Sequence, residues 1–79
     1  MAKQNSQETH AFGVATEIEG TVEAKGTNGQ VRALLEGGAV FKGESIITGP
    51  DSGAYIDFMG RGFANLGANQ SLKLDRHIT

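Results

Sequence analysis

The sequence contains no cysteine, no tryptophan and a single proline in its 79 residues. Without cysteine, neither a disulfide framework nor a thiolate metal site can form. Long apolar runs are also missing, and no window approaches the roughly 18 apolar residues that a transmembrane helix needs. A chain of this length suffices for one domain and buries only about 60 to 65% of the surface that its unfolded form exposes. Its stability must therefore come from packing and backbone pairing.

Charge of one sign is not in large excess either. Seven basic and nine acidic residues give a net charge of −2, and they are spread along the chain without a block of one sign. This distribution argues against binding to a phosphate backbone. We expect no nucleic-acid partner.

The first ten residues are polar and contain no apolar stretch, so they do not form an ordinary secretory signal peptide. We predict a flexible N-terminal tail over residues 1–12, one β-domain over residues 13–76, and the start of a linker at residues 77–79.

Glycine, by contrast, is abundant, with 12 in the chain. Between residues 34 and 75 a glycine recurs every few positions and divides apolar, β-prone sequence into pieces too short for helices. About six to eight short strands at hairpin spacing predict an all-β fold without a substantial helix. The architectures that suit them are a small antiparallel β-sandwich, which we expect, or a small barrel.

The first strand is predicted over residues 13–19, where Val14, Thr16 and Ile18 share one face. Ala15, Glu17 and Glu19 fall on the other face, so we expect a half-buried strand. Gly20 interrupts this pattern, and the alternation then resumes as far as Lys25. This continuity predicts one long strand with a bulge or bend at the glycine.

Two hairpins follow from turn chemistry. Asn28-Gly29 predicts a type I′ turn, because both residues tolerate the positive φ angles which that turn requires. A second tight connection is expected at residues 59–62. The strand before it, residues 53–58, has the clearest pattern, with Ile56 and Phe58 on one face.

Four aromatic residues, Phe41, Tyr55, Phe58 and Phe63, are predicted to serve the core. They do not alternate with basic residues as in a platform that stacks nucleic-acid bases. Tyr55 shares its face with Asp57, so its hydroxyl can stay in water.

No reaction centre is visible in the sequence. His10 and His77 lie at opposite ends of the chain without partners at ligand spacing. The sequence has neither a nucleophile motif nor a cysteine for thiol chemistry.

Possible ligand motifs are equally weak. The acidic residues Glu44, Asp51 and Asp57 do not form a calcium loop, and Gly60-Arg61-Gly62 does not have the spacing of a phosphate-binding motif. We therefore predict no catalytic, cofactor-binding or metal-binding residues, and no enzyme. A compact binding, anchoring or blocking module remains.

Five sequence pieces together form a recognisable pattern. They are Ile18 to Val22, Gly29 to Gly37, Val40 to Gly49, Ile56 to Phe58, and Leu66 to Leu72. In order and spacing they resemble the N-terminal retention module of giant RTX adhesins, the ice-binding adhesins included, which leave the cell through type I secretion systems. The piece from Gly43 to Gly49 also resembles FecR-type periplasmic β-domains.

The first resemblance implies a monomeric, non-catalytic module that folds in the periplasm of a Gram-negative bacterium. The module would plug the TolC-like outer-membrane pore and so hold the remainder of the adhesin at the cell surface. A periplasmic cysteine protease would release it at a di-alanine site in a downstream linker, although this sequence contains no Ala-Ala pair. No cofactor and no small-molecule substrate are implied. The FecR-type alternative implies a periplasmic domain that binds a ligand or protein in signalling.

Overall fold

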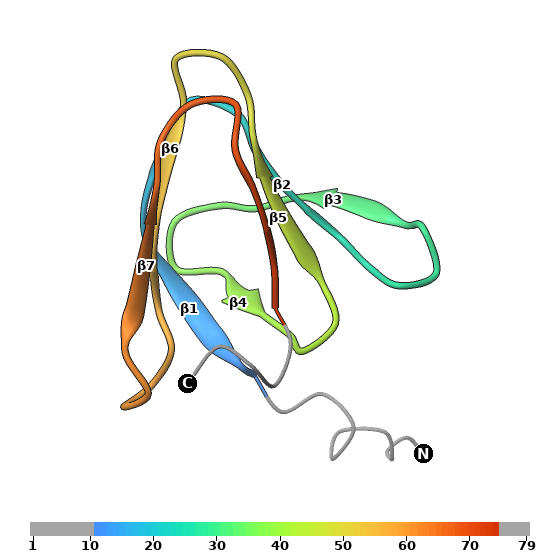
Figure 1. Cartoon of the computed structure of the whole chain (residues 1–79), viewed down its shortest axis with the longest axis vertical. Coiled ribbons are helices and arrows are strands. Elements are labelled where there is room, and N and C mark those ends of the chain that lie inside the picture. Colours follow the sequence, from blue (N-terminus) through green and yellow to red (C-terminus); the bar gives the residue numbers. More distant parts are fainter. Residues whose placement is uncertain (1–10, 75–79) are drawn as a thin grey trace.

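The computed structural model describes residues 11–74, which form eight short strands and no helix (Figure 1). The strands make two four-stranded antiparallel sheets packed against each other. The predicted all-β sandwich is confirmed. The predictions for residues 1–10 and 75–79, including most of the flexible tail and the linker, lie outside the described residues. No helix able to cross a membrane occurs in residues 11–74.

The first sheet, sheet A, has the strand order β4-β1-β6-β7. Its strands are β1 (Gly13–Glu19), β4 (Ala39–Val40), β6 (Gly53–Asp57) and β7 (Phe63–Leu66). Sheet B has the order β3-β2-β5-β8. Its strands are β2 (Val22–Lys25), β3 (Val31–Ala33), β5 (Ser45–Thr48) and β8 (Ser71–Lys73).

The chain passes repeatedly from one sheet to the other. Of the seven connections between eight strands, two are hairpins within a sheet, β2–β3 and β6–β7, and the other five cross between the sheets. Three crossings, at residues 20–21, 49–52 and 67–70, lie together at the top of Figure 1. We call this end of the sandwich, where three crossings between the sheets lie together, the laced end.

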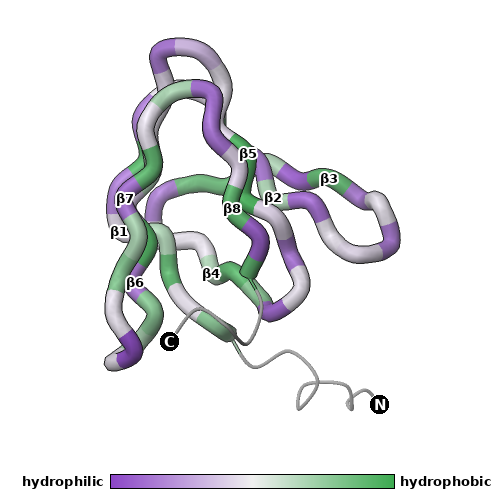
Figure 2. Tube along the Cα trace, viewed as in Figure 1, coloured by the Kyte–Doolittle hydropathy of each residue, from purple (hydrophilic) through white to green (hydrophobic). Residues whose placement is uncertain are grey.

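The core lies between the inner faces of the two sheets, and apolar residues (green in Figure 2) occur on strands of both. The largest fully buried side chains are those of Phe58, Leu34, Ile46, Ile56, Leu74 and Val40. Phe12, which the sequence places in the tail, is only 8% exposed. Its ring lies 5.6 Å from the ring of Phe58, and its amide donates to Val40 O at 2.7 Å. The packed region thus includes Phe12.

The prediction of one bent strand over residues 13–25 is wrong. β1 belongs to sheet A and β2 to sheet B, and the chain changes sheets at Gly20, whose φ is 71°. A residue with a side chain rarely adopts this left-handed conformation. An interruption expected to bend a strand instead ends it.

The predicted face of β1 is also wrong. Ala15 is fully buried, whereas Thr16 is exposed. The register against β6 shifts between Ala15 and Glu17, because a β-bulge places an extra residue there. Beyond the bulge, Ile18 packs against the core, so the alternation changes phase within the strand.

The β2–β3 hairpin is confirmed, but its turn is not type I′. Of the two residues Asn28 and Gly29, only Gly29 has a positive φ, of 88°. Gly29 N donates to Gly26 O at 3.0 Å and Gly26 N donates to Gln30 O at 2.8 Å. This is the three-residue loop in which a left-handed glycine follows a turn.

The β6–β7 hairpin is confirmed as well, and here two successive residues have positive φ. Met59 has a φ of 57° and Gly60 a φ of 94°, as a type I′ turn requires. Phe58 N donates to Gly62 O at 2.8 Å, so the loop contains an extra residue. That residue turns Phe63 outward.

The aromatic residues divide between the two sides of the sheets. Phe58 is buried as predicted, whereas the prediction of a core position for Phe63 is wrong, since it is 66% exposed. Phe63 stacks on Tyr55 on the outer face of sheet A, with ring centroids 5.1 Å apart. Phe41 is half-buried beneath the Arg32 guanidinium.

Candidate functional site

The acidic residues that could suggest a cation site are not grouped together, and two of the three have other partners. Glu44 pairs with Arg32, Asp51 occupies a turn at a φ of 53°, and Asp57 accepts a hydrogen bond from Met59 N at 3.0 Å. Within residues 11–74, no three His, Cys, Asp or Glu residues are grouped so that they could hold a metal ion. His10 and His77 lie outside the described residues.

Arg61, in the glycine-flanked hairpin, contacts an aromatic ring. Its guanidinium carbon lies 4.9 Å from the centroid of the Phe12 ring, a cation–π arrangement. The contact ties the hairpin to the start of the folded chain. It gives Arg61 a structural role that needs no bound anion.

The polar interactions of the fold gather where the chain crosses between the sheets. We call the residues at the laced end the crossing cluster: Thr21, Thr48, Gly49, Ser52, Gly67 and Gln70. Both buried polar side chains of the described residues, Thr48 at 3% exposure and Ser52 at 7%, belong to it.

Thr48 joins β5 to the crossing between β7 and β8. Its hydroxyl donates to Gly67 O at 2.6 Å and accepts from Gln70 N at 2.8 Å. Its own amide donates to Gln70 O at 2.8 Å. A buried hydroxyl that both donates and accepts a hydrogen bond restricts the motion of the groups that it joins. Its removal would leave Gly67 O and Gln70 N without a hydrogen-bond partner.

Ser52 makes the matching connection at the first crossing. Its hydroxyl accepts from Thr21 N at 2.9 Å and donates to Pro50 O at 3.0 Å. A Cβ atom at Gly20 would collide with this hydroxyl. The glycine therefore serves two needs, a left-handed φ and close approach to Ser52.

The two connections are linked through the backbone. Gly49 N donates to Thr21 O and Asn69 N donates to Gly49 O, each at 3.0 Å. The three crossings thus form one hydrogen-bonded unit.

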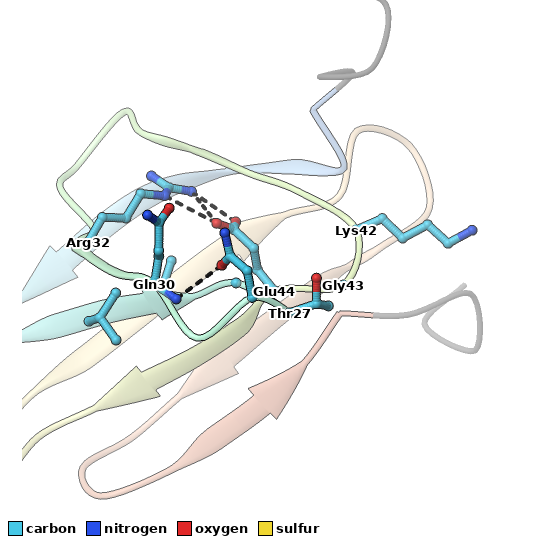
Figure 3. Close-up of a pocket in the computed structure, with 10 residues that line it drawn as sticks. Thr27, Gln30, Arg32, Lys42, Gly43 and Glu44 are labelled. Carbon is cyan, nitrogen blue, oxygen red and sulfur yellow. Dashed lines mark hydrogen bonds and ion pairs between the residues drawn. The ribbon is translucent and has the colours of Figure 1, made fainter.

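A second polar group, the Arg32–Glu44 clamp (Figure 3), joins β3 to the residue that precedes β5, at the other end of that strand from Thr48. Arg32 Nη2 lies 2.9 Å and Arg32 Nε 3.2 Å from the two carboxylate oxygens of Glu44. Arg32 Nη2 also donates to Ala39 O at 2.8 Å, and Glu44 Oε1 accepts from Phe41 N at 2.8 Å. The forked guanidinium thereby connects edge strand β3 with β4, through Ala39, and with the crossing that follows β4, through Glu44.

The clamp borders an open polar depression lined in part by Thr27, Gln30 and Lys42. In Figure 3, Lys42 extends away from the Arg32–Glu44 pair. Because Arg32 and Glu44 satisfy each other and nearby backbone groups, neither presents a free charge to a ligand. The Arg32–Glu44 pair in the lining of the depression therefore connects parts of the fold to one another.

Sequence reasoning did not find these polar groups. Arg32 and Glu44 both stand in the pieces that carry the family resemblance, and so do Thr48 and Gln70. The signal was therefore present as residue identity at fixed positions. What the sequence could not supply was the pairing, because Arg32 and Glu44 are separated by 12 residues and two crossings.

Comparison with known proteins gives one informative result. No family model matches the chain, and no curated protein does. A solved structure described as "Cell surface anchoring domain" matches it with a TM-score of 0.80 and 29% sequence identity. The match covers 87% of this chain and 91% of that one.

This likeness supports a surface-anchoring module. It fits a non-catalytic anchoring role and an association with the cell envelope or cell surface. Within residues 11–74, the polar side chains of the crossing cluster and of the Arg32–Glu44 clamp join strands to one another.

Proposed function

We propose that this chain is the retention module of a giant adhesin secreted by a type I system. It folds on the periplasmic side of the outer membrane, lodges in the TolC-like pore and holds the rest of the protein at the cell surface. The observation that carries the proposal is the likeness to a cell surface anchoring domain over nearly the full length of both chains. Release by a periplasmic cysteine protease acting on a downstream linker belongs to the same proposal.

The dimensions of the fold suit a plug. The molecule measures 41 × 26 × 21 Å along its principal axes, whereas an extended polypeptide strand is about 5 to 10 Å across. A pore narrower than the 21 Å shortest extent of the domain would pass the extended chain and stop the folded one. The crossing cluster and the Arg32–Glu44 clamp resist unfolding by joining strands that are far apart in sequence.

The proposal is tested by placing one charge inside or outside the sandwich of the full-length protein. Ile56 is fully buried and Leu35 is 68% exposed, and the two side chains are isomers. Ile56→Asp buries an unpaired carboxylate, which costs several kcal/mol, and it unfolds a domain of this size. Leu35→Asp leaves the fold intact.

The measurement is the fraction of adhesin that stays with the cells. We expect Ile56→Asp to move the protein into the medium and Leu35→Asp to leave it cell-bound. Circular dichroism of the purified 79-residue variants checks that only the first is unfolded. Cell retention of an unfolded Ile56→Asp protein would contradict the plug and would leave the FecR-type binding domain as the better account.

A further inference from the structure

The two sheets have four edge strands, and one of them lacks the usual protection against pairing. β4 is only two residues long, β3 carries Arg32, and β8 carries Lys73. β7 is four residues long and has neither a charged residue nor a proline. Shortness, charge and proline are the devices by which natural edge strands avoid pairing with other chains. β7 uses none of them.

The pairing of β7 with β6 determines which backbone groups of β7 point toward its unpaired edge. Phe58 N donates to Gly62 O, and Asp57 lies opposite Phe63. Because hydrogen-bonded and non-bonded pairs alternate in an antiparallel ladder, the amides and carbonyls of Phe63 and Asn65 point away from β6. They are placed to pair with an additional strand.

An exposed aromatic pair lies beside this edge. Tyr55 and Phe63 stack with an interplanar angle of 17° on the outer face of sheet A, and Phe63 is 66% exposed. In Figure 1, β7 lies at the side of the molecule away from β3. An incoming strand would meet an aromatic surface and backbone groups that bond to no other part of residues 11–74.

The charge of this face indicates what kind of strand fits. The outward positions of β1 and β6 carry the charged residues Glu17, Glu19 and Asp57, all of them acidic. Glu17 and Glu19 also border a depression that Glu36 and Tyr55 help to line. Lysine and arginine are complementary to such a face, and either can cover the Phe63 ring through a cation–π contact.

We infer that β7 docks an extended polypeptide segment in which basic and apolar residues alternate, as a fifth strand of sheet A. Backbone pairing with Phe63 and Asn65 supplies affinity, and basic side chains over Phe63 and near Asp57 supply selectivity. A second copy that pairs through the same edge fits less well, because strands β1, β6 and β7 carry no basic residue to meet these carboxylates. The inference is independent of the proposed retention function, since it concerns binding by the folded domain itself.

The probe is an eight-residue peptide of alternating arginine and valine, blocked at both ends, added to the isotope-labelled 79-residue chain. We expect changes in amide chemical shifts centred on residues 63–66, with binding that weakens as salt is added. A peptide with glutamate in place of arginine should not bind. A peptide N-methylated along one edge should lose binding, because it cannot complete the ladder.

Two variants localise the site. Phe63→Ser should weaken the peptide roughly fivefold through loss of the ring contact. Val31→Ser, at another exposed apolar position on an edge strand at 51% exposure, should leave affinity unchanged. Both positions are exposed, so both variants fold.

Other outcomes overturn the inference. Shift changes centred on β3 or β8, equal binding of the N-methylated peptide, or no binding at about 1 mM peptide would each exclude strand addition at β7. A dimer formed through β7 without peptide, detected by sedimentation, would assign the edge to a second copy instead.

Discussion

The laced end of the sandwich and the β6–β7 hairpin are built in opposite ways. At the laced end, two buried hydroxyls and the backbone around them join three crossings between the sheets. The hairpin is a local turn whose Met59 and Gly62 are exposed and whose Met59 adopts a left-handed φ of 57°. The laced end stabilises the fold, whereas the hairpin exposes its side chains to solvent and to potential partners. An anchoring module needs both, a body that does not unfold and a face that can meet a partner.

The largest expected difference between the regions comes from adding a methyl group to a glycine in each. Gly20 and Gly60 both have positive φ, of 71° and 94°. A Cβ at Gly60 meets nothing within 4 Å, whereas one at Gly20 meets the Ser52 hydroxyl. Gly60→Ala should cost about 1 kcal/mol for the left-handed conformation alone. Gly20→Ala should cost about 3 kcal/mol, because Ser52 must also give up its hydrogen bonds.

Urea unfolding of the 79-residue chain measures both costs. Equal losses would mean that the contact between the first two crossings does not contribute to stability.

A smaller difference is expected from removing one side-chain oxygen in each region. Thr48→Val keeps the shape of the buried residue but leaves Gly67 O and Gln70 N without their partner, and should cost about 2 kcal/mol. Asp57→Ala removes the acceptor for Met59 N at an exposed position, where water replaces it, and should cost about 0.5 kcal/mol. The free energies of unfolding of the two variants make the comparison. A larger loss for Asp57→Ala would reverse the assignment of the stabilising region.

The smallest effect is a gain in the hairpin. Met59→Asn places a residue that tolerates positive φ in the first position of the turn, and should stabilise the chain by about 0.5 to 1 kcal/mol. The thermal midpoint should rise by a few degrees. An unchanged or lower midpoint would show that the methionine is not strained there.

Much of the fold follows from local sequence, and its three-dimensional pairing does not. The alternation in residues 53–58 and the glycine turns were enough to predict short strands, two hairpins and a sandwich. Gly20 was misread because a continuing alternation looks the same whether the chain bends within a sheet or passes to the other sheet. Only the partners of β1 and β2, remote in sequence, distinguish the two cases.

The prediction of which side chains face the core failed for a related reason. An extra residue at Thr16 and another in the β6–β7 loop each change which face the following side chains occupy. Phe63 therefore lies on the outer face of sheet A, although its apolar side chain suggested a position in the core. The crossing cluster and the Arg32–Glu44 clamp were missed because hydrogen bonds across 12 to 31 residues depend on topology, which residue patterns do not specify.

Native-state amide hydrogen exchange tests the contrast between the two regions most directly. The Gln70 amide bonds to the buried Thr48 hydroxyl at 2.8 Å, and the Arg61 amide bonds to Phe58 O at 3.3 Å in the exposed hairpin. We predict that Gln70 exchanges only through global unfolding, with a free energy equal to that from urea, and that Arg61 exchanges orders of magnitude faster through local opening. Exchange of Gln70 as fast as Arg61 would contradict the account, because the laced end would then open without the rest of the fold.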